Sequence, residues 1–259
     1  MATFLLYAAI TVFIYMSILF VIAIIQRDNS LADIGWGLGF TIVALLTFFL
    51  DKGFTARHIV VTALVVIWGT RLTTHIFLRH RGKGEDPRYA AWRKEWGRWV
   101  IIRSFFQVFM LQGLLLLFIV YVVIVVNSSS VEGFSILDIC GLAVWIIGFL
   151  FESVGDFQLK QFLADEKNRG HIMSTGLWRY TRHPNYFGEA TMWWGIFLIA
   201  LSVPYGWTAI ISPIVITFLL LRVSGVILLE KEFMDNEEFN EYKKRTSAFI
   251  PWFPKREKQ

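Results

Sequence analysis

The sequence predicts an all-α, polytopic integral membrane protein with seven transmembrane helices, its N-terminus outside and its C-terminus in the cytoplasm. Two observations predict this fold class: the composition, and the alternation of long apolar stretches with basic connections. The 259 residues are 56% hydrophobic and only 17% charged, whereas a soluble domain has about 25% charged residues. Such a chain cannot cover itself with a hydrated surface. The composition therefore excludes a soluble enzyme, a disordered chain and a disulfide-rich secreted domain.

Seven apolar stretches are expected to form the spans, because a bilayer core of ~30 Å needs about 20 helical residues. They cover residues 3–25, 34–50, 59–78, 105–126, 136–151, 191–204 and 207–229. The second, fifth and sixth are short, so adjoining polar residues, such as those at 152–156 and 186–189, must continue their helices. The first stretch lacks a basic leader and a small-residue cleavage site, so we expect a span rather than a signal peptide.

Basic residues are distributed asymmetrically across these spans. Twenty-one of the 25 lysines and arginines fall on one side, mainly in the connections 79–104, 157–188 and 231–259, and two fall on the other. The positive-inside rule places the richer side in the cytoplasm. The basic residues are scattered and match no nucleic-acid-binding motif, so we expect membrane lipids, and no nucleic acid, as partners.

The chain has no internal repeat, linker or break in composition, so we expect a single membrane domain over residues 1–259. Ionisable side chains at membrane depth are costly and indicate functional positions. Nine lie in or beside the spans: Asp33, Arg71, His75, Asp138, Glu152, Asp156, Glu189, Arg222 and Glu230. Apart from Asp138, near the external end of its span, they predict a polar cavity that opens inward. An arginine that only pairs with an acidic neighbour to join helices is the alternative.

Helical spacing groups several of these residues. Arg71 and His75 are four apart and share one face of the third span. Glu152 and Asp156 have the same spacing, and Lys160 continues their stripe. The two carboxylates could accept hydrogen bonds from a ribose, and the lysine that follows them could bind a phosphate. The alternative is a helix end whose charged side chains are only solvated.

The strongest signal in the chain is the segment 176–189, which reads Gly-Leu-Trp-Arg-Tyr-Thr-Arg-His-Pro-Asn-Tyr-Phe-Gly-Glu. Pro184 suits the first turn of a helix. Asn185, Tyr186 and Glu189 then project from the opening turn of the sixth span. A helix N-terminus beside basic residues is a natural site for anionic groups. An asparagine and a glutamate four apart can also hydrogen-bond an amide or a ribose.

This segment, followed by a tryptophan-rich span, resembles the C-terminal region of the membrane steroid 5-alpha-reductases and sterol reductases. The isoprenylcysteine carboxyl methyltransferases carry a similar Arg-His-Pro-x-Tyr-x-Gly. The likeness extends over residues 150–253, about 40% of the chain, from Glu152-Ser-Val-Gly-Asp-Phe-Gln-Leu-Lys160 to Ala248-Phe-Ile-Pro-Trp-Phe253. With the loop 82–89, the chain is most similar to a bacterial branch of that group. This resemblance implies a bacterial inner membrane protein whose active site opens to the cytoplasm.

The resemblance also implies a reductase that holds NADPH in residues 150–253, with the helices of residues 1–104 on the substrate side. In the family, an aspartate of the fifth span and the asparagine and glutamate of the His-Pro-Asn segment contact the cofactor. These match Asp156, Asn185 and Glu189 here. Weaker counterparts lie in the same neighbourhood: Glu152, Lys160, Arg169, His171, Trp178, Arg179 and Tyr186.

The last span departs from the reductase pattern. The 5-alpha-reductases have an arginine and a histidine there, whereas this chain has Glu230-Lys-Glu232, closer to the acidic pair of the methyltransferases. Glu230 is therefore a candidate cofactor contact, and S-adenosylmethionine is the alternative to NADPH. The 2′-phosphate of NADPH needs nearby cations, and the candidates are Lys83, Lys160, Arg169, Arg179 and Arg182.

The N-terminal half must polarise the substrate. The 5-alpha-reductases pair a glutamate on the second span with a tyrosine on the third, above the substrate carbonyl. Asp33 matches the glutamate, but the third span offers Arg71 and His75 instead of a tyrosine. Enone reduction places negative charge on the carbonyl oxygen, which a preorganised donor stabilises. A protonated Asp33, Arg71 or His75 can be that donor, and the alternative for Asp33 is that it only holds Arg71 or His75 in place. Tyr89, in the loop after the third span, is a third catalytic candidate, with contact to the cofactor as the equal alternative.

The sequence thus predicts an NADPH-dependent reductase that saturates a C=C bond of a lipophilic enone such as a 3-oxo-4-ene steroid. An S-adenosylmethionine-dependent methyltransferase of a lipid or thiol is the alternative. A non-enzymatic transporter or lipid-binding membrane protein is disfavoured because the buried charges gather at one end. The glycines of 35–39 resemble a dinucleotide fingerprint but lie in a span, so we expect close helix packing. The histidines lack metal-ligand spacing, so we expect no metal. The oligomeric state is not indicated.

Overall fold

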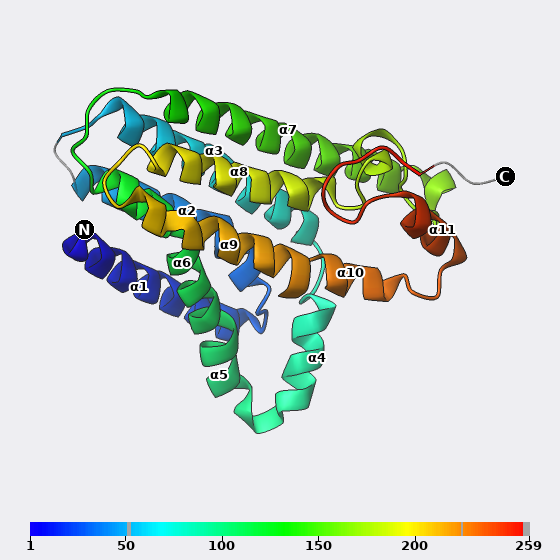
Figure 1. Cartoon of the computed structure of the whole chain (residues 1–259). Helices are drawn as coiled ribbons and strands as arrows, with labels where there is room; N and C mark the ends of the chain where they lie inside the picture. Colours follow the sequence, from blue (N-terminus) through cyan, green and yellow to red (C-terminus); the bar gives the residue numbers. More distant parts are fainter. Residues whose placement is uncertain (51–52, 224, 256–259) are drawn as a thin grey trace. The chain divides into compact units, whose positions relative to one another are not determined.

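The computed structural model describes residues 1–50, 53–223 and 225–255, and their regular structure is helical (Figure 1). In this part of the chain the only β-bridge joins Thr181 and Ser247. Six helical runs are long and apolar enough to cross a membrane. They are Ala2–Gln26 (α1), Leu31–Leu50 (α2), Ala56–His80 (α3), Pro87–Asn127 (α4 to α6), Ile136–Ala164 (α7) and Gly206–Glu232 (η5 to α10). The predicted all-α fold is confirmed for the described residues, and the six apolar runs indicate an integral membrane protein.

The sixth expected span is in α8, which runs from Pro184 to Ala200. Its 17 residues extend about 25 Å at 1.5 Å per residue, which is less than the ~30 Å of a bilayer core. Six spans among the described residues, rather than seven, therefore satisfy both length and composition. The count of seven and the orientation of the termini stay predictions.

The chain divides into two compact units. The first comprises residues 1–135 and 200–212, and the second comprises residues 136–199 and 213–259. Unit 1 contains α1 to α3, α4 (Pro87–Trp96), η1 (Gly97–Trp99), α5 (Val100–Arg103), η2 (Ser104–Met110), α6 (Leu111–Asn127) and η5 (Gly206–Ile210). Unit 2 contains α7, η3 (Glu166–Asn168), η4 (Gly176–Arg179), α8, most of α9 (Ile211–Phe218), η6 (Leu219–Val223), α10 (Val226–Glu232) and α11 (Glu237–Arg245).

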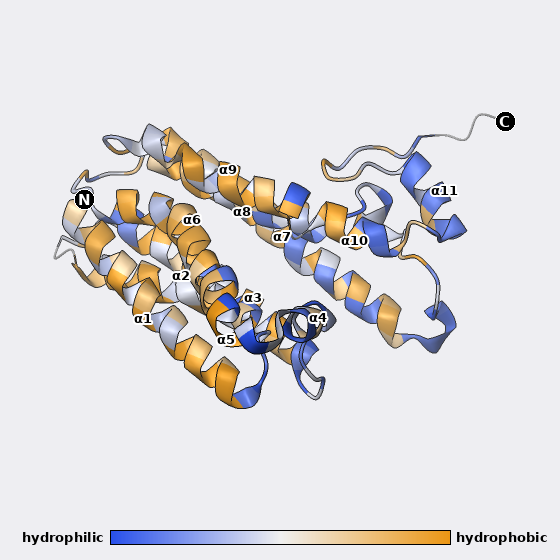
Figure 2. Ribbon diagram, turned by 90° about the horizontal axis from the view of Figure 1, so that it is seen from below, coloured by the Kyte–Doolittle hydropathy of each residue, from blue (hydrophilic) through white to orange (hydrophobic). Residues whose placement is uncertain are grey.

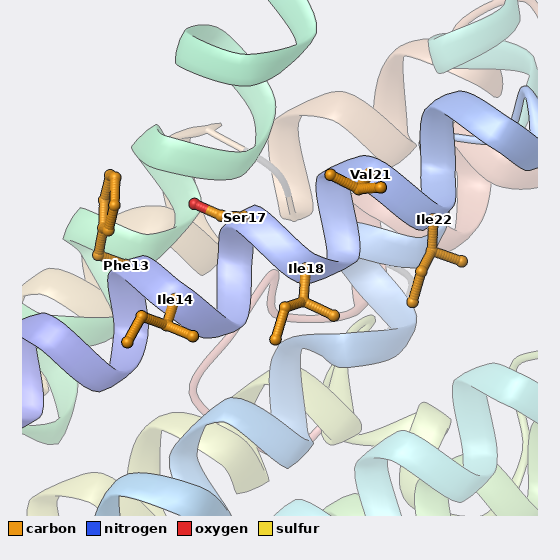
Figure 3. A pocket seen from close by; sticks show the side chains of 6 residues that line it. All are labelled: Phe13, Ile14, Ser17, Ile18, Val21 and Ile22. Carbon is orange, nitrogen blue, oxygen red and sulfur yellow. The ribbon is translucent and has the colours of Figure 1, made fainter.

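Apolar side chains cover the long helices, and polar ones gather in the shorter elements. Figure 2 shows α1 and α9 mostly in the hydrophobic colour and α11 mostly in the hydrophilic one. A shallow apolar groove follows the outer face of α1 alone (Figure 3), lined by Phe13, Ile14, Ser17, Ile18, Val21 and Ile22. Phe13, Ile18 and Val21 are each more than half exposed. A face of this kind is suited to lipid tails, not to a polar ligand.

Two glycines bring α2 and α3 into backbone contact in unit 1. A Cβ atom on Gly37 would lie 2.4 Å from the carbonyl oxygen of Gly69, and one on Gly69 would lie 2.5 Å from that of Gly37. Either distance is far below van der Waals contact, so only glycine fits at this crossing. The prediction that the glycines of 35–39 serve close helix packing, as small residues do in membranes, is confirmed.

The connection expected at 79–104 contains the helix α4. Asp86 caps α4 by accepting a hydrogen bond from the backbone N–H of Arg88 (2.9 Å), Pro87 stands at the first helical position, and Gly97 ends the helix with a φ of 49°. This order of cap, proline and terminal glycine is the usual helix signature. The chain then returns through α5 into α6, so α4 and α5 form two arms of a V in unit 1 (Figure 1).

Glycines also set the packing of α7 against α8 in unit 2. A Cβ atom on Gly141 would lie 2.5 Å from the carbonyl oxygen of Gly195, and one on Gly148 would lie 2.6 Å from that of Gly188. Each helix repeats its glycine after seven residues, which is two helical turns and therefore the same face. The two helices consequently touch through their backbones over at least two turns.

Gly188→Ala should destabilise unit 2, because the new methyl group would lie 2.4 Å from the backbone nitrogen of Glu152. Overpacking of this kind costs about 1–3 kcal/mol, which a lower melting temperature in detergent would report. Gly84→Ala is the control, since nothing lies within 4 Å of a Cβ atom there. Equal melting temperatures for the two variants would contradict the close packing of α7 and α8.

Candidate functional site

A cluster of polar side chains surrounds Asp33 in the first turn of α2. The Tyr89 hydroxyl donates a hydrogen bond to Asp33 Oδ1 at 2.7 Å. Gln112 Nε2 lies 3.2 Å from the same oxygen and 3.1 Å from the Tyr89 hydroxyl. Arg88 forms an ion pair with Asp33 Oδ2 at 3.0 Å. The carboxylate thus accepts from three donors, on α4 and α6, while the Tyr89 side chain is buried among them.

Turn hydrogen bonds bring α4 to this position. The backbone N–H of Asp86 donates to Ser30 Oγ at 2.8 Å, and the backbone N–H of Asn29 donates to Glu85 Oε1 at 2.8 Å. The Asp86 carboxylate in turn accepts from Arg88, and these hydrogen bonds lower its pKa although its partial burial acts to raise it. The turn before α2 and the loop before α4 are therefore joined directly, which places Tyr89 over Asp33.

Two further polar contacts, Asp28 with His80 and Glu85 with Arg93, support the same junction. Asp28 Oδ2 lies 2.8 Å from His80 Nε2 at the end of α3. Burial acts to raise the pKa of Asp28, but hydrogen bonds from Ser30 and His80 outweigh it and lower the pKa. The Arg93 guanidinium donates two hydrogen bonds of 2.8 Å to the Glu85 carboxylate. These bonds join α4 to the loop that precedes it.

Of the four predicted catalytic residues, the structure joins two. Asp33 and Tyr89 are in direct contact. Arg71 and His75 are half-buried on α3. Among the contacts of the Asp33 carboxylate are hydrogen bonds from Arg88 and Tyr89 of α4 and from Gln112 of α6.

The predicted cofactor residues lie in unit 2, around the start of α8. Asn185 Nδ2 donates to Asp156 Oδ1 at 3.1 Å. This pairing follows from the glycine packing, because Gly155 faces Pro184 with only 3.1 Å from a Cβ position to the proline ring. The buried Trp178 indole donates to the carbonyl oxygen of Gly155 at 3.1 Å. The 3₁₀ turn η4 is thereby attached to the same point of α7.

The other predicted residues of unit 2 differ in exposure. Glu152 is 3% exposed and Glu189 is 8% exposed, so both carboxyls lie inside the protein. Tyr186 is half-buried and stacks on the His183 ring, with 5.5 Å between centroids. The remaining candidates are exposed: Lys160, Arg169, Arg179 and His171, the last of which lies 3.2 Å from Glu238.

Glu230 occupies an ion cluster at the end of unit 2. It accepts from Arg182 at 2.8 Å and His183 at 3.3 Å, and it lies 3.4 Å from Lys243. Arg182 also donates to the carbonyl oxygens of Lys243 and Thr246 and is only 7% exposed. Arg182, offered above as a phosphate ligand, is therefore engaged by the protein itself, because its guanidinium joins the start of α8 to the C-terminal segment.

Sequence reasoning missed two members of the Asp33 cluster, Gln112 and Arg88. Gln112 is an uncharged amide inside an apolar stretch, so a search for ionisable groups at membrane depth passes over it. The sequence nevertheless carries a signal for Gln112, because it is the single polar side chain between residues 108 and 120. Arg88 was counted only as one of many basic residues in a connection.

The helices and these clusters define a class: an all-helical integral membrane protein with polar side chains gathered at the ends of its apolar helices. Residues 19–246 match the model of a family described as "Protein of unknown function (DUF1295)", and the chain belongs to that family. This family is related to the steroid 5-alpha-reductase-like proteins.

The chain is also similar to the uncharacterized protein C594.04c of Schizosaccharomyces pombe. The two are 24% identical over 225 residues, which cover 76% of this chain and 65% of the yeast protein. The chain therefore spans less than two thirds of that relative's length, and the relative's name assigns no reaction.

Arg182→Met should destabilise the protein, because it leaves the partly buried Glu230 carboxylate without its shortest partner. Removing one member of a buried ion pair costs about 3 kcal/mol or more, visible as a lower melting temperature without any ligand. Lys244→Met is the matched control, since Lys244 is 71% exposed in its pair with Glu241 and exposed pairs contribute little. If both variants melt with the wild type, the Arg182 cluster does not hold unit 2 together.

Proposed function

We propose that the protein is an NADPH-dependent reductase that saturates a C=C bond of a lipophilic enone, such as a 3-oxo-4-ene steroid. The observation that carries this proposal is the 2.7 Å contact between the Tyr89 hydroxyl and Asp33. A carboxyl and a tyrosine are the pair that the resembled reductases set above a substrate carbonyl. Here the tyrosine comes from α4 rather than from the third span.

The chemistry of unit 1 suits carbonyl activation. Negative charge develops on the carbonyl oxygen when hydride reaches the β-carbon, and a preorganised O–H donor stabilises that charge. Among the residues around Asp33, the Tyr89 hydroxyl is such a donor: its O–H is directed to the Asp33 carboxylate here, and it would turn to the carbonyl oxygen of a bound substrate. We therefore assign Tyr89 as the acid and Asp33 as the group that orients it, in preference to a protonated Asp33, Arg71 or His75.

The residues of unit 2 fit a dinucleotide. The Asn185 amide and the Asp156 carboxylate offer both donors and acceptors for an amide or ribose. Exposed Lys160, Arg169 and Arg179 remain available for phosphate charge, whereas Arg182 does not. When bound there, NADPH would supply the hydride, and Asn185, Asp156 and Glu189 would hold it.

The alternative, a methyltransferase that uses S-adenosylmethionine, rests on the acidic pair at Glu230 and Glu232. In the structure the Glu230 carboxylate is in contact with Arg182, His183 and Lys243, while Glu232 is exposed. An acidic residue already matched by protein cations is a poor candidate for a cationic cofactor. This arrangement supports NADPH over S-adenosylmethionine.

NADPH should raise the melting temperature of the detergent-purified protein, and S-adenosylmethionine should not. A ligand at ~100 times its Kd stabilises the folded state by about 2.7 kcal/mol. Asn185→Ala should reduce the NADPH shift because it removes the amide paired with Asp156, while the melting temperature without ligand changes little. Asn240→Ala, at an exposed asparagine on α11, should keep the full shift. Stabilisation by S-adenosylmethionine alone would overturn the reductase assignment.

Tyr89→Phe should lower the rate of NADPH oxidation with a 3-oxo-4-ene steroid by roughly a hundredfold or more, as expected for loss of a general acid. The exposed Tyr7 on α1 provides the control, and Tyr7→Phe should retain the wild-type rate. Product analysis would confirm that the C=C bond, rather than the carbonyl, is reduced. A Tyr89→Phe variant with full activity would exclude Tyr89 as the acid.

A further inference from the structure

We infer that Gln112 is a positioning residue for the Tyr89 hydroxyl, a role that rests on the reductase function proposed above. Gln112 is in the first turn of α6, one residue after its start at Leu111. Its side-chain nitrogen is within hydrogen-bond distance of both Tyr89 and Asp33, at 3.1 and 3.2 Å. It is the one group in the cluster that contacts both members of the catalytic pair through a single atom.

The chemistry of the cluster decides which end of the Gln112 amide faces the pair. A carboxylate accepts hydrogen bonds and does not donate them, so only the NH2 end of the amide can face Asp33 favourably. Its two N–H groups then serve the Asp33 and Tyr89 oxygens separately. The carbonyl oxygen of the Gln112 amide is buried and has no hydrogen-bond partner among the residues that the structure describes. The side chain therefore forgoes one hydrogen bond to make the two toward the catalytic pair.

The backbone around Gln112 is fixed on both sides. The preceding element, η2, is a π-helix from Ser104 to Met110, and single π turns within α-helices are frequent at functional sites. On the other side, a Cβ atom on Gly113 would lie 3.1 Å from Met16 and 3.2 Å from Val12 of α1. The π turn sets the rotation of α6, and the contact at Gly113 sets its distance from α1. Together they leave the Gln112 side chain little freedom to move from the pair.

This geometry specifies what Gln112 does during reduction. As hydride is delivered to the β-carbon, the Tyr89 O–H leaves its hydrogen bond to Asp33 and gives its proton to the carbonyl oxygen, which forms an enol and leaves a Tyr89 phenolate. The phenolate oxygen keeps the N–H of Gln112 as a donor, and the Arg88 guanidinium lies 5.6 Å from the centre of the Tyr89 ring. The enol then tautomerises to the saturated ketone, and water returns a proton to Tyr89. Gln112 thus stabilises the charge that Tyr89 carries after proton transfer.

The first test compares Gln112→Leu with Gln107→Leu, a matched control at an exposed glutamine of η2. With a 3-oxo-4-ene steroid and NADPH, Gln112→Leu should lower kcat about tenfold, the scale of one hydrogen bond to a charged group. The KM for the steroid should change less than twofold, and Gln107→Leu should match the wild type. A rise in KM with unchanged kcat would overturn the positioning role, because it would make Gln112 a substrate contact.

Gln112→Glu keeps the shape of the side chain and separates positioning from packing. The introduced carboxyl can donate only when protonated, and when ionised it repels Asp33. The ratio of its kcat to that of the wild type should therefore rise as the pH falls, by about tenfold between pH 8 and pH 5.5. A residue that only fills space would show no such pH dependence, and a flat ratio would overturn the proposal.

A double-mutant cycle tests the same contact without enzyme activity. Gln112→Leu should lower the melting temperature of the ligand-free wild type, but by less in a Tyr89→Phe background, where the Tyr89 hydroxyl is already gone and only the hydrogen bond to Asp33 is lost. If the two substitutions are coupled in this way but the protein reduces no enone, the Gln112–Tyr89 contact is supported and the proposed reaction is rejected. Additive effects of the two substitutions would reject the contact itself, whatever the activity.

Discussion

Both units depend on backbone contact between helices at glycine. In lipid, no hydrophobic force drives apolar helices together, so close packing through small residues is a main source of association. Gly37 with Gly69, and Gly188 with Gly148, bring carbonyl oxygens within about 2.5 Å of where a Cβ atom would stand. These crossings determine which turn of one helix faces which turn of the next. The polar clusters can form only after this register is set.

The polar contacts of each unit follow from that register and from short turns. In unit 2, the approach of Gly155 to Pro184 leaves Asp156 beside Asn185. In unit 1, the turn before α2 is hydrogen-bonded to the loop before α4, so α4 starts over Asp33. The capped start of α4 then presents Tyr89 one turn later. A rigid backbone thus holds each side chain, which is what a preorganised donor requires.

The charged residues of the protein separate into two kinds. Those around Glu230 satisfy one another and join the start of α8 to the C-terminal segment, where Thr181 also hydrogen-bonds the carbonyl oxygen of Phe249. Those of the Asp33 cluster surround the buried Tyr89 hydroxyl, which donates a hydrogen bond to the Asp33 carboxylate. Equal polarity in a sequence therefore does not imply an equal environment, because the tertiary structure decides which partners surround each polar side chain.

The sequence by itself determined the all-helical membrane fold, the glycine packing of 35–39 and the candidates Asp33, Asp156 and Asn185. These depend on composition, helical periodicity and local motifs, which one chain displays directly. Only the tertiary structure joined Tyr89 and Gln112 to Asp33 and engaged Arg182 with Glu230. The partner of a polar side chain depends on helix crossings and turns between residues far apart in the chain. Tyr89 and Asp33 are 56 positions apart, and no local pattern encodes their contact.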